Sequence, residues 1–205
     1  MSWPGGRPPR ADRSRGMPVA MALLTVGHGT LGQPELTALL VGAGVESLVD
    51  VRSAPGSKRH PHVARAAMER WLAEAGVGYR WEPRLGGWRK PEPGSPNTAL
   101  RNDSLRGYAD YMRTPPFWEA LDGVLAEATV HSTAIMCSET LYWRCHRRLV
   151  ADAAVLGRGA EVLHLGHDRR TSPHRLTDGV RSEDGRPVYD LGGPALLLDL
   201  EGPDG

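Results

Sequence analysis

The residues best suited to chemistry lie in one segment, Ala134 to Leu156, with the sequence AIMCSETLYWRCHRRLVADAAVL. It holds both cysteines of the chain, Cys137 and Cys145, with Glu139 and His146. A thiol, a carboxylate and an imidazole so close together can serve nucleophilic, acid–base or metal chemistry. The segment therefore predicts a site, although it does not name a substrate.

A strand, a turn and a helix are expected to position these groups. Residues Thr133 to Cys137 are apolar and suited to a buried strand, and a helical period is expected from about Leu141. Cys137 would then end a strand and face a helix N-terminus, where ligands bind in open α/β sheets and a thiolate is stabilised. Cys137 is accordingly either a low-pKa nucleophile or a small buried core residue.

The expected helix also predicts which neighbouring side chains face the core and which face solvent. On a helical wheel Cys145 lies on the apolar face, about two turns from Cys137. This position predicts a core thiol that points away from Cys137. His146 lies at the edge of that face, and Arg147 lies on the polar side with the other arginines of the segment. Glu139 precedes the helix, where it either caps the first turn or acts as an acid or base.

Two loops rich in arginine and histidine follow other predicted strands. The first, DVRSAPGSKRHPH, begins at Asp50 after the strand Ser47 to Val51, and the second, Gly166 to Arg181, follows the strand Ala160 to Leu165. In a parallel sheet both loops open on the same edge as Cys137, which predicts an anionic ligand. The alternative for the first loop is structural, with Asp50 capping the loop and pairing with Arg52.

The remaining pattern predicts a single α/β domain, a mainly parallel sheet flanked by helices with Rossmann-like or rhodanese-like layering. A strand, a helix and a second strand within the first part of the fold form a right-handed βαβ unit. A helix is expected to open at Tyr108 and continue past Pro115, after a long polar stretch, Arg84 to Arg106. We expect a disordered basic leader at 1–20, the domain at 21–200 with a short strand at 195–200, and a tail at 201–205.

The composition argues against several classes of protein. The net charge is +1, so no global field favours nucleic acid or a membrane surface. Two cysteines do not make a disulfide framework, which favours a reducing, cytoplasmic location. No apolar run approaches the roughly 20 residues needed to span a bilayer, so no membrane partner is expected.

Six ordered motifs carry a family resemblance: TVGHGT, LVDVRSAPGSKRHPH, LGG, RNDSLRGYADYMRTPPF, MCSETLYWRCHRRLVAD and PHRLT. Over Leu23 to Arg181 the chain resembles the bacterial DUF488 family, whose function is unassigned, so the resemblance implies a fold and a site more than a reaction. A looser resemblance to rhodanese-like and cysteine-phosphatase sites is weakened by the absence of a glycine-rich loop after Cys137. The positions that match the family motifs are Gly27, His28, Asp50, Arg52, Pro55, Gly86, Gly87, Gly107, Tyr108, Tyr111, Cys137, Glu139, Cys145, His146, Arg147 and His174.

Three functional hypotheses follow. The first is an enzyme acting on a small anionic or nucleotide-like substrate, with Cys137, Glu139 and His146 in the catalytic role. The second is a metalloprotein with iron or zinc on Cys, His and Glu ligands, joined by histidines of nearby loops; the sequence requires no other cofactor. The third binds or processes nucleic acid through stacking aromatic residues and arginine loops. The residues expected to bind substrate are His28, Asp50, Arg52, Arg59, Trp88, Tyr108, Tyr111, Arg147 and His174.

Overall fold

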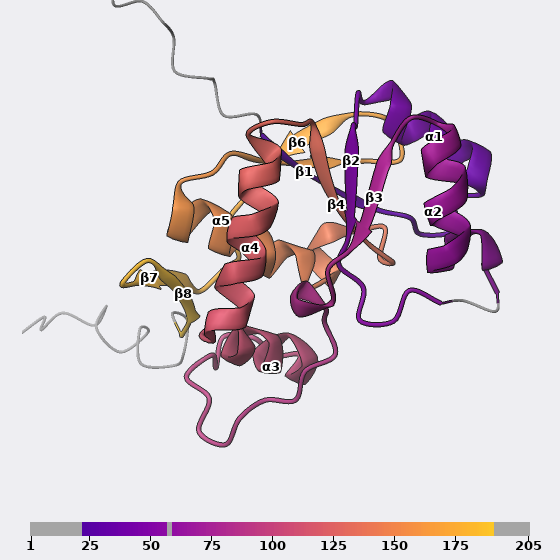
Figure 1. The fold of residues 1–205 in the computed structure, drawn as a ribbon. Coiled ribbons are helices and arrows are strands. Elements are labelled where there is room, and N and C mark those ends of the chain that lie inside the picture. Colours follow the sequence, from indigo (N-terminus) through magenta and orange to yellow (C-terminus); the bar gives the residue numbers. More distant parts are fainter. Residues whose placement is uncertain (1–21, 57–58, 191–205) are drawn as a thin grey trace, which may run out of the picture.

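A mainly parallel sheet forms the centre of the molecule (Figure 1). The computed structural model describes residues 22–56 and 59–190. Its strands are β1 Leu23–Gly27, β2 Ser47–Asp50, β3 Gly78–Trp81, β4 Thr133–Cys137, β5 Val162–Leu165, β6 Thr171–Pro173, β7 Val180–Glu183 and β8 Arg186–Tyr189. Six of them form one sheet in the order β3-β2-β4-β1-β5-β6, in which β6 alone is antiparallel to its neighbour, and β7 and β8 form a separate antiparallel ribbon.

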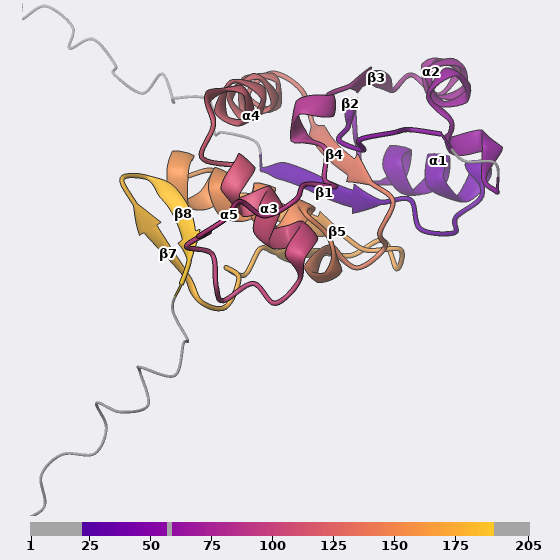
Figure 2. The same ribbon diagram turned by 90° about the horizontal axis from the view of Figure 1, so that it is seen from below.

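Helices cover both faces of this sheet. The α-helices are α1 Gln33–Gly42, α2 Arg65–Glu74, α3 Asp103–Tyr111, α4 Pro115–Ala128 and α5 Arg147–Arg158, and the 3-10 turns are η1 Pro61–Val63, η2 Pro83–Leu85 and η3 Tyr142–Arg144. α1 and α2 lie on one face, and α4 and α5 lie on the other (Figures 1 and 2). Because the chain crosses one face after β1 and the other after β4, a crevice is expected where the carboxyl ends of these adjacent strands meet.

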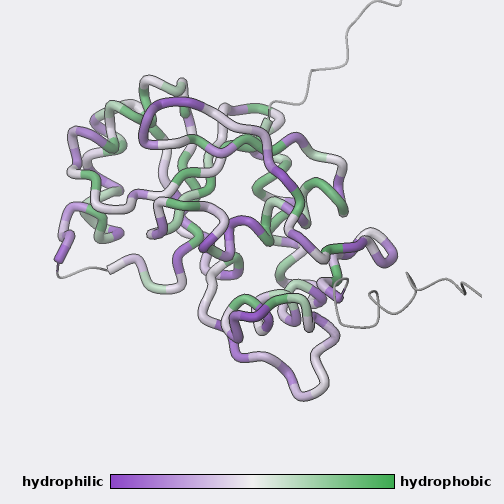
Figure 3. Tube along the Cα trace, turned by 180° about the vertical axis from the view of Figure 1, so that it is seen from behind, coloured by the Kyte–Doolittle hydropathy of each residue, from purple (hydrophilic) through white to green (hydrophobic). Residues whose placement is uncertain are grey.

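Each central strand supplies side chains to two hydrophobic cores. Leu48 of β2 packs in the core under α1 and α2, and its neighbour Val49 packs in the core under α3, α4 and α5. Successive residues of a strand point to opposite faces, so a strand covered on both sides must be apolar throughout. β1 and β4 are accordingly buried at every position, and the hydrophobic stretches gather in the interior of the trace (Figure 3).

The predicted fold class is confirmed: the chain forms an α/β domain with a mainly parallel sheet and Rossmann-like layering. The strand expected at Thr133 to Cys137 matches β4 at both ends. The helix expected from Leu141 is wrong at its start, because α5 begins only at Arg147 and η3 precedes it. Cys145 interrupts the helical path with an extended backbone, at φ −127° and ψ 153°.

The middle of the chain contains more structure than the sequence pattern predicted. α3 begins inside the stretch expected to be a polar loop, where the Asn102 side chain accepts the backbone N–H of Leu105 as an N-cap. The helix expected to run past Pro115 is two helices, since α4 starts anew at that proline, which fits the first turn of a helix but not its interior. The loop expected at 166–181 contains β6 and the beginning of β7.

Some predictions concern other parts of the chain. The basic leader at 1–20, the strand at 195–200 and the tail at 201–205 lie outside the described residues. In the part of the chain that the structure describes, no helix has the length and apolar character needed to cross a bilayer.

A buried chain of hydrogen bonds joins β1 and β5 to α5 and β8. Asp152 accepts from the Tyr189 hydroxyl and from His174 Nε2, each at 2.9 Å. A carboxylate only accepts, so His174 Nδ1 receives the Nε2–H of His164 at 2.9 Å, and His164 Nδ1 receives the Thr25 hydroxyl at 2.6 Å. Both ring nitrogens of each imidazole thus lie within hydrogen-bond distance of a buried partner.

Acid is expected to destabilise the fold through His164. Burial, then neighbouring His174 and Arg147, lower its pKa from 6.5 to about 3. Between these values the unfolded chain binds the proton that the folded chain rejects, so this contribution makes the free energy of unfolding fall as the pH falls, by at most about 1.4 kcal/mol per pH unit. Urea unfolding at a series of pH values measures the slope. His164→Gln should flatten it and His131→Gln, at an exposed histidine, should not; equal slopes would contradict the prediction.

Candidate functional site

Two cysteines and a histidine converge at the carboxyl end of β4. The Sγ atoms of Cys137 and Cys145 lie 2.6 Å apart, and Cys145 Sγ lies 3.6 Å from His146 Nδ1. The three donor atoms all lie within 4.8 Å of one another. Cys137 ends the strand, whereas Cys145 and His146 connect η3 to α5, so one short loop brings all three together.

Cys145 is buried in the core as predicted, but the expectation that it points away from Cys137 is wrong. It assumed a continuous helix from Leu141, which would have carried the second sulfur away from the strand end. The extended backbone at Cys145 instead turns its side chain back toward β4. Cys145 is buried, but it is buried against the other thiol.

The His146 ring is oriented by contacts on its other side. Nε2 lies 3.3 Å from the carbonyl oxygen of Val51, which can only accept, so Nε2 carries a proton. Nδ1 is the nitrogen that faces Cys145; with a proton it can donate to a thiolate, and without one it offers its lone pair to a metal ion. The ring packs closely on Gly87, since a Cβ there would lie 3.0 Å from Nδ1.

The two thiols titrate in opposite directions. Burial and the hydrogen bond to Cys145 raise the pKa of Cys137 well above its ordinary value. Burial also acts to raise the pKa of Cys145, but the hydrogen bond from Cys137 and the nearby His146 and Arg147 lower it well below its ordinary value. Cys145 is therefore the thiolate of the pair, which does not favour the expected low-pKa nucleophile at Cys137.

A cavity of about 490 Å³ opens beside these residues. It is lined by side chains that follow β1, β2 and β4, including His28, Arg52 and Glu139. Glu139 is exposed to solvent in this cavity. Trp88, 80% exposed, also lines the cavity, and its φ of 59° is an unusual backbone angle for a bulky residue.

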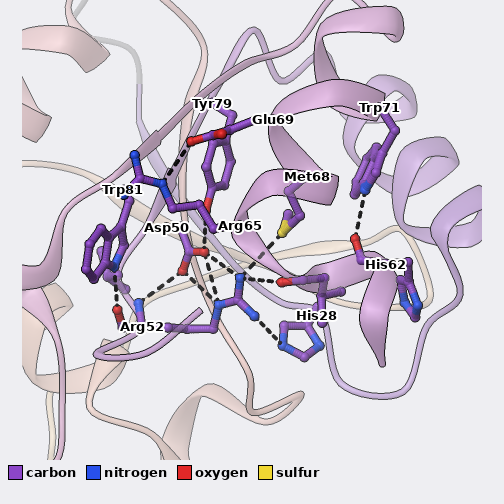
Figure 4. Close-up of polar contacts among 12 residues, drawn as sticks. His28, Asp50, Arg52, His62, Arg65, Met68, Glu69, Trp71, Tyr79 and Trp81 are labelled. Atoms are coloured by element: carbon purple, nitrogen blue, oxygen red, sulfur yellow. Dashed lines mark hydrogen bonds and ion pairs between the residues drawn. The ribbon is translucent and has the colours of Figure 1, made fainter. Parts of the chain in front are cut away.

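Asp50 and Arg52 form a buried ion pair beside the cavity (Figure 4). Asp50 also accepts the Tyr79 hydroxyl at 2.7 Å, and Arg52 donates to the carbonyl oxygen of Val63 at 2.8 Å. His28 Nε2 lies 3.4 Å from Arg52 Nη1, and burial together with this cation lowers the pKa of His28 to about 4. The pairing expected from the structural alternative is therefore present, and most of the donors of Arg52 are already occupied.

The structure gathers only part of the predicted site. The predicted residues that line the cavity are Cys137, Glu139, His146, His28, Arg52 and Trp88. Tyr108 is buried and donates its hydroxyl to the carbonyl oxygen of Leu85, while Tyr111 lies under the Arg89 guanidinium. His174 belongs to the buried chain of hydrogen bonds described above, and Arg59 is exposed and lines none of the cavity.

The placement of Arg147 on a polar face is wrong. Its side chain is 1% exposed, and Nη2 donates to the carbonyl oxygens of Glu139 and Thr140. The cause is again the late start of α5: the first turn of the helix faces the interior, where loop carbonyl groups provide acceptors. Arg144 was not predicted as a site residue, but it is exposed and lines the cavity.

A family model covers most of this framework. A model described as a domain of unknown function, DUF488, matches residues 34–154, more than half of the 205-residue chain. The matched span runs from α1 into α5 and includes Cys137, Cys145 and His146. No curated protein and no solved structure matches the chain, and the looser rhodanese-like resemblance is not confirmed.

Gly27 should be essential for this arrangement. A Cβ at this position would lie 1.8 Å from the carbonyl oxygen of Glu139 and 2.8 Å from Arg147 Nη2. Gly27→Ala should therefore destabilise the fold by about 1–3 kcal/mol, measured by urea unfolding.

Gly123→Ala is the matched control, because nothing lies within 4 Å of a Cβ in that exposed position of α4. It should stabilise the fold by about 0.5–1 kcal/mol. A neutral Gly27→Ala variant would show that the loop does not depend on this close approach.

Proposed function

The chain belongs to the DUF488 family, and we propose that it is a metal-dependent enzyme whose Cys137, Cys145 and His146 bind a zinc ion. The observation that carries the proposal is the convergence of these three donors, with the His146 ring oriented by its contact with Val51. A ligating histidine commonly donates its second ring N–H to a carbonyl or carboxylate in this way. The donor set, two thiolates and one imidazole, is one that zinc prefers.

The distances fit a tetrahedral ion after a small adjustment. With bonds of about 2.3 Å to sulfur and 2.0–2.1 Å to nitrogen, tetrahedral ligands lie roughly 3.6–3.8 Å apart. The 3.6 Å between Cys145 Sγ and His146 Nδ1 agrees with this spacing. The 2.6 Å between the two sulfurs does not, so one cysteine side chain would rotate outward by about 1 Å. Glu139 stands outside the three-residue group, which keeps its carboxylate available for another role.

Three protein ligands are the pattern of a catalytic rather than a structural zinc site. A bound zinc ion with one open position supplies a Lewis acid and lowers the pKa of water. Cys137, Cys145 and His146 all line the 490 Å³ cavity, so a substrate in the cavity would reach the centre directly. Hydrolysis of a small molecule is the reaction class that this arrangement supports best.

Two side chains of the cavity suit a small anionic or nucleotide-like substrate. Glu139 is an exposed carboxylate that lines the cavity, and it would take and return a proton during hydrolysis. Arg144 is an exposed cation of the same lining, and it would attract and orient an anionic group. Arg52 contributes positive potential from the cavity wall, while its ion pair with Asp50 holds it in place.

Thiol chemistry is the second candidate, and the 2.6 Å separation of the sulfurs favours it. Cys145 as thiolate and Cys137 as its hydrogen-bond donor would form a reactive dithiol. Oxidation of the pair to a disulfide would release two electrons and the protons of the thiols to a disulfide or peroxide oxidant. Zinc binding and disulfide formation use the same sulfur atoms, so the two states exclude each other.

Metal content separates the two candidates. Plasma mass spectrometry of the protein as purified should find close to one zinc per chain. Cys137→Ser, Cys145→Ser and His146→Gln should each weaken zinc binding by more than about 100-fold, beyond the 10- to 100-fold loss typical of an outer partner. Cobalt substitution should give the absorption of a thiolate–cobalt bond, and each cysteine variant should weaken it.

His60→Gln is the matched control, because His60 lines the same cavity but lies outside the group of three donors. It should retain zinc. Stoichiometric iron in place of zinc would uphold the metal centre and overturn the choice of ion. A metal-free chain with a Cys137–Cys145 disulfide in its peptide map would reject the metal centre in favour of thiol chemistry.

A further inference from the structure

A second cavity, of about 480 Å³, lies at the same edge of the sheet. It is lined by Thr25 of β1, by residues 140–143 and Arg147, and by residues 164–168 and 170–172. None of these residues lines the first cavity. The loop that follows β4 therefore contributes to two separate cavities, with the cysteines in one and Arg147 in the other.

Arg147 is a buried cation that forms no ion pair with a carboxylate of the described residues. Its Nη2 donates to the carbonyl oxygens of Glu139 and Thr140, and its buried Nε has no hydrogen-bond partner. Among the described residues, no carboxylate forms an ion pair with it, although Asp50 pairs with the similarly buried Arg52. A buried charge is costly unless it is paired, so Arg147 has the character of a binding group for an anion.

A second arginine lines the same cavity. The Arg170 side chain is exposed there and can approach a bound group from the solvent side. The one acidic residue of the lining, Asp168, accepts the backbone N–H of Arg170 at 3.1 Å and so caps its own turn. Thr140, Thr171 and Ser172 add hydroxyl groups to the lining. Two cations and several hydroxyl donors suit a phosphate group, and the negative charge of Asp168 offsets only part of the positive charge.

An aromatic pair without net charge forms another part of the lining. Tyr142 stacks on His164 with ring centroids 3.4 Å apart and an interplanar angle of 9°. His164 is fixed in turn by Thr25 and by His174, which is bound to Asp152. Because its low pKa keeps His164 neutral, this part of the lining does not compete with the arginines for the anion.

We propose that the second cavity binds the phosphate group of a small molecule through Arg147 and Arg170. The second cavity shares no lining residue with the first, but Arg147 connects the two, because its backbone N–H donates to Cys145 Sγ at 3.4 Å. The second cavity would allow the protein to recognise a phosphorylated ligand beside the hydrolytic site. A guanidinium presents a planar fork of donors that matches phosphate oxygens, and Arg147 is held in position before a ligand arrives.

Binding of inorganic phosphate to the full chain tests this site. Isothermal titration at constant ionic strength, with chloride as the competing anion, should give saturable phosphate binding. Arg170→Gln should weaken the affinity about tenfold or more, as expected for loss of a charged hydrogen bond. Arg169→Gln is the matched control, because Arg169 is the exposed neighbour that does not line the cavity; it should change the affinity by less than about twofold.

Two further variants make the result decisive. Arg147→Lys keeps the buried charge but loses the planar fork, and it should weaken phosphate binding while thermal unfolding remains cooperative. Arg144→Gln removes the cation proposed to hold an anionic group in the first cavity, so phosphate binding that persists in this variant and is lost in Arg170→Gln belongs to the second cavity. The proposal is overturned if phosphate binds no better than chloride, if Arg169→Gln and Arg170→Gln behave alike, or if Arg144→Gln alone weakens binding, which would assign the anion to the first cavity. Should Arg147→Lys not fold, the comparison of Arg169 with Arg170 decides the question.

Discussion

The hydrogen bonds from the Arg147 guanidinium to the loop after β4 are the interaction on which both cavities depend. Nη2 donates to the carbonyl oxygens of Glu139 and Thr140, and these bonds connect the start of α5 to the loop that precedes it. The loop closes on itself in consequence, and Cys145 returns to Cys137. Gly27 makes this possible, because a side chain on β1 would occupy the place of the Glu139 carbonyl group.

Two buried arginines at this edge of the sheet differ in their hydrogen-bond partners. Arg52 is paired with Asp50, and the pair is completed by Tyr79, His28 and a backbone carbonyl group. Such a pair is a fixed part of the wall, because removing either partner would leave the other charge buried and alone. Arg147 is satisfied only by carbonyl groups and keeps its net charge. The Arg52–Asp50 pair is part of the scaffold. The charge of Arg147 is not neutralised by a carboxylate, so an anionic ligand could pair with it.

The cysteine pair gives the site its chemical character. Two sulfurs and an imidazole nitrogen at one point, in a cavity open to solvent, offer both a metal centre and a dithiol. The contact of His146 Nε2 with the Val51 carbonyl group holds Nδ1 toward the sulfurs, which is the ring orientation that the proposed metal centre requires. A metal would also remove the need for the two thiols to share a proton at such a short distance.

The sequence alone determined the fold class and the position of Cys137 at the end of a strand. Apolar strands alternating with amphipathic helices predict a parallel sheet, because a strand buried on both faces needs continuous apolar residues. The same pattern predicted a strand from Thr133 to Cys137, and the structure has these bounds for β4. The motif resemblance identified the correct family. Local signals sufficed here because each depends on a short run of residues.

Tertiary structure alone decided which side chains meet. The helical wheel placed Cys145 in the core but pointing away from Cys137, and it placed Arg147 on the polar side. Cys145 is in the core, whereas the predicted direction of its side chain and the placement of Arg147 were wrong, because α5 begins at residue 147. What delays the helix is a set of contacts with distant residues: the thiol of Cys137, the carbonyl group of Val51 and the absent side chain of Gly27. Helical periodicity cannot register such contacts, since it measures only the sequence neighbours of a residue. The meeting of these side chains therefore depended on packing between segments that are far apart in the chain, as for His146 and Val51, which are 95 residues apart.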